Sequence, residues 1–115
     1  MTTHVDLAAL TEGEDDGDGV HWTLGPPSEL NVNLVRLDPG HRIEAHVGGV
    51  DVAVVVLRGD GRAVVDHTTH ELGPHTLVHI SKGAERQIEA GADGLWYLTV
   101  HRRREGPTIS TSRPG

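Results

Sequence analysis

Nine histidines in a chain of 115 residues are the first feature that could support chemistry. Imidazole is the commonest metal ligand in proteins, and it also transfers protons near neutral pH. The chain has no cysteine, which excludes disulfides, thiolate nucleophiles and thiolate metal ligands. It also lacks the GxSxG motif of serine hydrolases and the GxxxxGK[ST] phosphate-binding loop. A site in this protein must therefore be built from nitrogen and oxygen atoms.

Short β-strands separated by turns are expected to position these side chains. Apolar, β-branched segments predict strands at 21–24, 30–37, 50–57, 62–66, 70–72, 76–80, 86–89 and 95–101. Residues rich in Gly, Pro and Asp predict turns between them, including 38–40, 58–61, 73–74, 81–83 and 91–94. Only residues 5–10 have a trace of helical periodicity. Many short strands with closely spaced turns predict an all-β antiparallel sandwich or barrel.

The length predicts a single domain, because single domains run to about 100–200 residues. Hydrophobic residues make up 36% of the chain and aromatic residues 3%, with no Phe, so the core must consist mainly of Val, Leu, Ile and Ala. We expect an N-terminal segment with an acidic loop at 1–19, a barrel at 20–105 and a polar tail at 106–115. The tail is expected to be extended or mobile.

The net charge of −7 argues against nucleic acid or an anionic membrane surface as a partner. No apolar run approaches the roughly 20 residues needed to cross a bilayer, and no secretory signal precedes the strands. The absence of cysteine fits a cytoplasmic location. We therefore expect a cytoplasmic protein whose main partner is a small molecule.

Two ordered motifs resemble those of the cupin superfamily. In PGHRIEAHVGGVDVAVVVLRGDGRAVVD, Gly40, His46 and Gly59 fall on the positions of the first cupin motif. In HELGPHTLVHISKGAERQIEAG, Gly73 and Gly83 fall on those of the second. The resemblance spans about residues 30–100 and is to small single-domain cupins of the cupin-2 type. It implies an antiparallel jelly-roll β-barrel, with any ligand site in its open mouth.

The resemblance also shows that most of the usual cupin metal ligands are missing. Many cupins bind a divalent metal with three His and one Glu, and His46 matches the first of these. Gly48, Val52 and Arg86 stand at the other three positions. Glycine and valine offer no donor atom, and a protonated guanidinium repels a cation. We therefore expect no metal at the usual site and no cofactor.

His46 and Arg86 are the main candidates for binding a ligand. A guanidinium binds a carboxylate or phosphate with two hydrogen bonds, and a nearby imidazole can donate or shuttle a proton. The alternative is that Arg86 pairs with a local acid, namely Glu44, Glu85 or Glu89, or that it faces outward. The sequence leaves these alternatives open.

Asn31 and Asn33 share one face of their strand and are further candidates. On an interior face they would need hydrogen-bond partners, which a polar ligand could supply. On an exterior face they would be ordinary surface residues. The two tryptophans, Trp22 and Trp96, are expected to pack in the core or at a dimer interface.

Three functions remain open from the sequence. The first is a cupin-like barrel without the usual metal that binds a small polar or anionic molecule in its mouth. The candidate ligand-binding residues are His46, Arg86, Asn31 and Asn33. A homodimer is expected, because a small jelly roll leaves sheet edges and an apolar face to be covered.

The second function is a metal-dependent cupin enzyme of the dioxygenase or isomerase type. It would use displaced ligands, for which the candidates are His46, His41, His79 and His101. The third is a non-catalytic structural or interaction module whose mouth is filled by side chains. The sequence does not decide whether the protein is an enzyme, and it identifies no catalytic residue.

Overall fold

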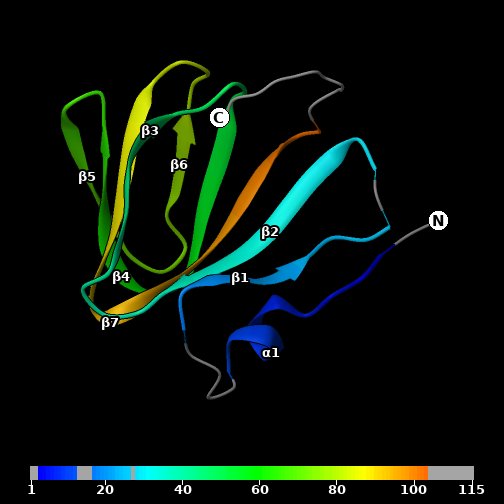
Figure 1. Ribbon diagram of the computed structural model, residues 1–115. Helices are drawn as coiled ribbons and strands as arrows, with labels where there is room; N and C mark the ends of the chain where they lie inside the picture. Colours follow the sequence, from blue (N-terminus) through cyan, green and yellow to red (C-terminus); the bar gives the residue numbers. More distant parts are fainter. Residues whose placement is uncertain (1–2, 13–16, 27, 104–115) are drawn as a thin grey trace.

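The structure, a computed structural model, describes residues 3–12, 17–26 and 28–103 (Figure 1). Its elements in chain order are α1 Leu7–Thr11, β1 Gly19–Thr23, β2 Leu30–Leu37, β3 Arg42–Val47, β4 Val52–Val65, β5 Thr68–Leu72, β6 Leu77–Ile80 and β7 Glu85–Arg102. The tail expected at 106–115 and residues 13–16 of the acidic loop lie outside the described residues. No helix in the described part is long and apolar enough to cross a membrane.

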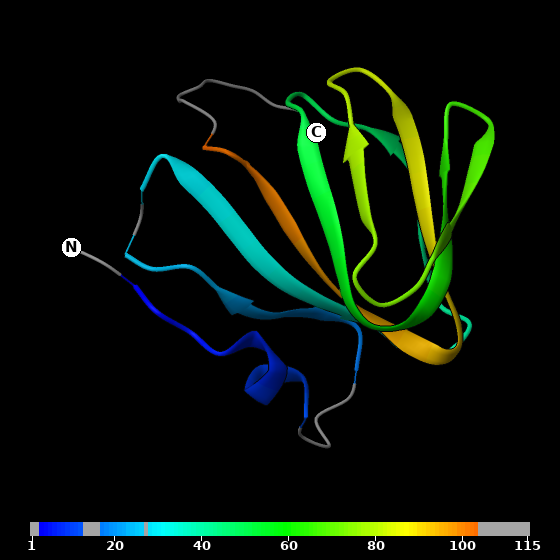
Figure 2. The ribbon, with the colours of Figure 1, turned by 180° about the vertical axis from the view of Figure 1, so that it is seen from behind.

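The strands form one antiparallel sheet that folds over into two facing layers (Figures 1 and 2). The first layer has the order β1-β2-β7-β4-β6 and uses the C-terminal half of β7 and the N-terminal half of β4. The second layer has the order β3-β7-β4-β5 and uses the other halves of the same two strands. The antiparallel jelly-roll barrel predicted from the sequence is confirmed.

Two predicted turns are wrong, because β4 and β7 continue through them. Residues 58–61 and 91–94 are bends at which each long strand passes from one layer to the other. The pairing between β4 and β7 shifts register at Val56/Arg58 and at Gly59/Gly61, as a β-bulge does. Glycine is found at such bends as readily as at chain reversals. The sequence pattern alone therefore predicted two short strands in place of each long one.

Strand β3, at Arg42–Val47, was not predicted as a strand. Its side chains are mostly exposed, and only Ile43 and the pairing with β7 tie it to the barrel. The strand therefore lacks the alternation of apolar and polar residues on which a sequence-based prediction depends. Helix α1, Leu7–Thr11, falls close to the segment with helical periodicity, and Asp6 caps its N-terminus.

Apolar side chains pack on both sides of the first layer. The interior cluster between the layers includes Val54, Val56, Leu95 and Tyr97. A second cluster on the outer face is formed by Leu34, Trp22, Trp96 and Leu98 with Leu7 and Leu10 of the helix. The N-terminal helix therefore covers part of the outer face beside β1 (Figures 1 and 2).

The bend in β4 depends on a glycine whose replacement should destabilise the protein. Gly59 has φ +88°, and a Cβ on it would lie 2.9 Å from the Gly94 carbonyl carbon and closer still to the oxygen. We expect Gly59→Ala to lower the free energy of unfolding by about 3 kcal/mol, since neither backbone can move without breaking the sheet.

Urea unfolding of Gly59→Ala and of Gly73→Ala would check this expectation. A Cβ on Gly73 meets nothing within 4 Å, so this control should stay within about 0.5 kcal/mol of the wild type. Equal unfolding free energies for the two variants would contradict the role given to Gly59.

Candidate functional site

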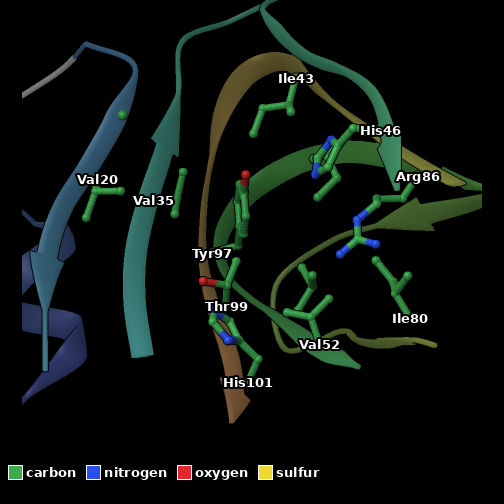
Figure 3. Close-up of a pocket in the computed structure, with 13 residues that line it drawn as sticks. Val20, Val35, Ile43, His46, Val52, Ile80, Arg86, Tyr97, Thr99 and His101 are labelled. Carbon is green, nitrogen blue, oxygen red and sulfur yellow. The ribbon is translucent and has the colours of Figure 1, made fainter. Parts of the chain in front are cut away.

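A cavity of about 360 Å³, partly open to solvent, lies between the two layers, and Figure 3 shows the side chains that line it. His46 and Arg86 both line it. Most of the remaining wall is aliphatic and includes Val35, Val54 and Ile88. The structure therefore brings the two main candidate residues into one apolar cavity.

His46 and Arg86 are neighbours across strands β3 and β7. Side chains at directly paired positions project from the same face of a sheet, which turns both residues inward. Nδ1 of His46 lies 3.1 Å from the carbonyl oxygen of Glu44. Because a carbonyl oxygen only accepts hydrogen bonds, we assign the proton to Nδ1. Nε2 is then the nitrogen that can contact a ligand.

Arg86 is 8% exposed, and burial lowers the pKa of its guanidinium. Nη1 donates a hydrogen bond to the carbonyl oxygen of Ala84 at 3.2 Å. Within the described residues no acid forms an ion pair with Arg86. The acids named above as alternative partners form no ion pair with Arg86 in the described part of the chain. They are Glu44, Glu85 and Glu89. A buried positive charge thus lines the cavity, and most of its N–H donors have no partner among the described residues.

The positions at which cupins carry metal ligands do meet around this cavity. A Cβ built on Gly48 would lie 2.8 Å from Nη1 of Arg86 and 2.9 Å from Cζ, so the guanidinium fills the space of the missing side chain. Val52 is 8% exposed and lines the same wall. One imidazole, one cation, one methyl-bearing side chain and a glycine do not fit a divalent metal.

Three further polar residues of β7 line the cavity. They are Tyr97, Thr99 and His101, which alternate along the strand and so share its inner face. Only His101 was named from the sequence, as a candidate metal ligand. The spacing of two between positions 97, 99 and 101 is the signal that would have placed the other two on the same face. Nδ1 of His101 lies 2.9 Å from the Arg102 carbonyl oxygen, which again leaves Nε2 free.

Asn31 and Asn33 lie on the inner face of β2, beside the cavity. Their partners across the sheet are His101 and Thr99, which line it. Nδ2 of Asn33 donates to Oδ1 of Asn31 at 3.1 Å, and the Thr23 hydroxyl donates to Oδ1 of Asn33 at 2.8 Å. Both asparagines therefore lie on the interior face, but other protein groups already form hydrogen bonds with several of their polar atoms.

The four histidines named as displaced metal ligands do not form one site. His41 is bonded to Asp18 and His79 to Asp51, each on the exposed surface. His79 faces away from the cavity because it alternates with Ile80, which lines it. The two that remain at the cavity are His46 and His101.

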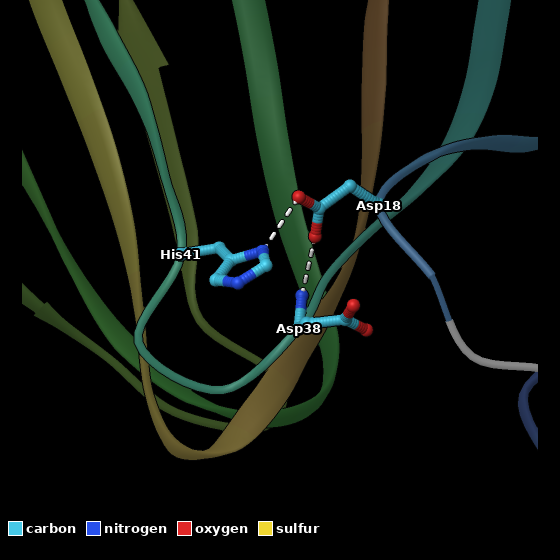
Figure 4. A group of neighbouring side chains, drawn as sticks. All are labelled: Asp18, Asp38 and His41. Atoms are coloured by element: carbon cyan, nitrogen blue, oxygen red, sulfur yellow. Dashed lines mark hydrogen bonds and ion pairs between the residues drawn. The ribbon is translucent and has the colours of Figure 1, made fainter.

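Asp18, Asp38 and His41 form a compact cluster at the surface, in which Asp38 is half-buried (Figure 4). Nδ1 of His41 lies 2.7 Å from Oδ2 of Asp18, and Oδ1 of Asp18 accepts a hydrogen bond from the Asp38 amide at 2.7 Å. Asp38 in turn accepts hydrogen bonds from the amide of Gly17 and from Arg36. These bonds tie the start of β1 to the turn before β3, so the cluster has a structural explanation.

The cluster makes stability depend on pH. The hydrogen bond to Asp18 raises the pKa of His41 above 6.5, and the bonds from Asp38 and His41 lower the pKa of Asp18 below 3.8. The contribution of His41 to the free energy of unfolding is therefore complete below pH 6.5 and is lost as pH rises through the raised pKa of the imidazole. The Asp18 contribution is complete above pH 3.8 and is lost in stronger acid.

We expect His41→Gln to be less stable than the wild type near pH 5.5 and to differ less from it near pH 8.5. Urea unfolding at about pH 5.5 and about pH 8.5 measures the difference at each pH. If the difference in unfolding free energy between the two proteins is the same at both pH values, the ionic role of His41 is contradicted.

No protein-family model and no curated protein sequence matches this chain. Solved structures do match it. A cupin superfamily protein from Desulfitobacterium hafniense superposes with a TM-score of 0.73 and 16% identity, over 89% of this chain and 92% of that chain. An RmlC-like cupin with a double-stranded β-helix fold, from Methanocaldococcus jannaschii, gives 0.68 and 16%, over 77% and 83%.

A conserved protein of unknown function from Streptococcus pyogenes is also similar, with a TM-score of 0.74 and 22% identity, over 92% of this chain and 91% of that chain. These similarities confirm the cupin fold predicted from the two motifs.

Proposed function

We propose that this chain, which has a cupin fold, binds a small carboxylate in the barrel mouth without the usual cupin metal. The observation that supports the proposal is the burial of Arg86 with no acidic partner among the described residues. An unpaired buried charge is costly, and removal of water by a ligand raises that cost further. A carboxylate relieves it by accepting two parallel hydrogen bonds from the guanidinium.

The number of charged groups favours a carboxylate over a phosphate. Arg86 is the one cationic side chain among the cavity-lining residues that is charged at every physiological pH. The planar fork of one guanidinium matches the two oxygens of a carboxylate, whereas a phosphate dianion needs more donors. Nε2 of His46 supplies a further hydrogen bond when the ring is protonated.

The apolar walls favour a ligand with a hydrocarbon body. A volume of about 360 Å³ lies within the range of about 300–1,000 Å³ typical of small-molecule sites. Aliphatic side chains from several strands form most of the surface, including Val35, Val54, Ile80 and Ile88. The ligand is therefore a carboxylic acid with several carbons.

The cavity also argues against the other functions considered. A module whose mouth is filled by side chains would leave no such space beside His46. A metal enzyme with displaced histidines would need ligands that the structure places at separate sites.

Calorimetric titration of untagged protein with hexanoate and hexanamide tests the proposal. The two compounds have almost the same shape, and only the acid carries a charge. In the presence of a chelator, hexanoate should bind at least about tenfold more tightly than the amide, because only the carboxylate neutralises Arg86. Equal affinities, or no binding by any straight-chain acid from propionate to octanoate, would contradict the proposal.

A further inference from the structure

Tyr97 carries a second polar group in the same cavity. The residue is 1% exposed, and its hydroxyl forms no hydrogen bond with any described residue. Figure 3 shows the hydroxyl of Tyr97 entering the cavity together with the His46 ring and the Arg86 guanidinium. Buried tyrosine hydroxyls usually have a partner, so this one needs an explanation.

The neighbours of Tyr97 explain why no described residue supplies a partner. The residues paired with Tyr97 across the sheet are Val35 on one side and Val56 on the other. Val20, which pairs with Val35, continues the same row. Aliphatic side chains therefore flank the ring on both sides, and the open side of the hydroxyl is the cavity.

The phenol of Tyr97 remains protonated at physiological pH. Burial raises its pKa well above the usual value of 10.0, and the Asp18 carboxylate contributes to the same shift. A neutral phenol both donates and accepts a hydrogen bond. Because the proposed carboxylate binds Arg86, the oxygen left for the phenol is a second one on the ligand, either a hydroxyl or a carbonyl.

We propose that the ligand is a hydroxy or oxo acid, whose carboxylate binds Arg86 and whose second oxygen binds the hydroxyl of Tyr97. The inference rests on the proposed binding of a carboxylate by Arg86 and specifies the class of acid. An acid that carries only hydrogen at the position beside the Tyr97 hydroxyl would displace water from the phenol and replace none of the hydrogen bonds that this water made. The cavity thus selects for an oxygen at one position along the hydrocarbon body.

A hydroxyl scan of hexanoate tests the inference. Hexanoate and each of its monohydroxy derivatives are titrated calorimetrically into the wild type and into Tyr97→Phe. One derivative should bind the wild type about tenfold more tightly than hexanoate, as expected for one additional neutral hydrogen bond. Tyr97→Phe should remove this gain and should bind hexanoate at least as tightly as the wild type, because it no longer has a hydroxyl that hexanoate would leave without a partner. Retained hexanoate binding also shows that the variant keeps an intact cavity.

The other outcomes separate this inference from the proposed function. If the wild type binds hexanoate but gains at no hydroxyl position, or if Tyr97→Phe keeps the gain, the assignment of Tyr97 is wrong. If Tyr97→Phe binds hexanoate itself more weakly than the wild type does, the phenol contacts the carboxylate, and the proposed contact with a second ligand oxygen is wrong. If no acid binds at all, the proposed function fails and the present inference falls with it.

Discussion

Replacing Arg86 with methionine should abolish carboxylate binding while making the ligand-free protein more stable. Methionine keeps much of the length and apolar surface of arginine but removes a charge that is 8% exposed and has no acidic partner in the described chain. Loss of one partner from a buried charge pair weakens binding by about 100-fold or more. Removal of an uncompensated charge should raise the free energy of unfolding by about 1 kcal/mol.

Calorimetric titration with hexanoate and urea unfolding without ligand measure the two effects. Arg62→Met is the matched control, because Arg62 is exposed and its Nε lies 3.6 Å from Glu89 on the outer surface. This control should bind like the wild type and change stability by no more than about 0.5 kcal/mol. If Arg86→Met binds hexanoate as tightly as the wild type, Arg86 is not part of the binding site. A loss of stability in Arg86→Met would show that the hydrogen bond to Ala84 and the packing of the guanidinium against Gly48 outweigh the cost of burying the charge.

The sequence predicted the barrel because its two motifs lie in order among β-branched strands, yet it could not show how those strands bend. Inward-facing residues of β4 are even-numbered up to Val56 and odd-numbered from Ala63. In β7 they change in the same way, from Ile88 and Ala90 to Leu95. A bulge produces this change of phase, and the glycines that permit it resemble turn residues.

The candidate site shows the same division between what the sequence determines and what packing determines. The motif predicted that residues 46 and 86 would meet, since it aligns them with ligands of a single site. Whether Arg86 faces the cavity or an external acid depends on the register of β3 against β7, because a shift of one residue reverses the face. The largely exposed β3 carries no hydrophobic pattern that would specify this register.

Tyr97 was missed for a different reason. A single tyrosine within LWYLTV is explained by core packing alone, and the structure does bury it in the interior cluster. Its significance comes from valines on neighbouring strands, which leave the hydroxyl without a partner in the part of the chain that the structure describes. These strands are distant in sequence, so only the assembled sheet shows that the hydroxyl is available to a ligand.

Restoring the missing ligands should turn the mouth into a metal site. The variant Gly48→His/Val52→Glu/Arg86→His places donors at positions that already surround one end of the cavity with His46. It also removes the buried cation, which opposes any metal. We expect zinc or nickel to bind this variant about 1,000-fold more tightly than the wild type. Untagged wild-type protein should contain far less than one metal per chain by elemental mass spectrometry.

The same variant with His46→Gln provides the control. Glutamine removes the one ligand that the natural sequence retains, so metal affinity should fall by about 100-fold if the four positions act as one site. Stoichiometric metal in the wild type would contradict the carboxylate proposal, because Arg86 would then lie beside a cation. Tight metal binding that survives His46→Gln would place the metal among the surface histidines. Metal binding that is absent from the wild type and depends on His46 in the variant would show that the residues at positions 48, 52 and 86 together keep metal out of the mouth.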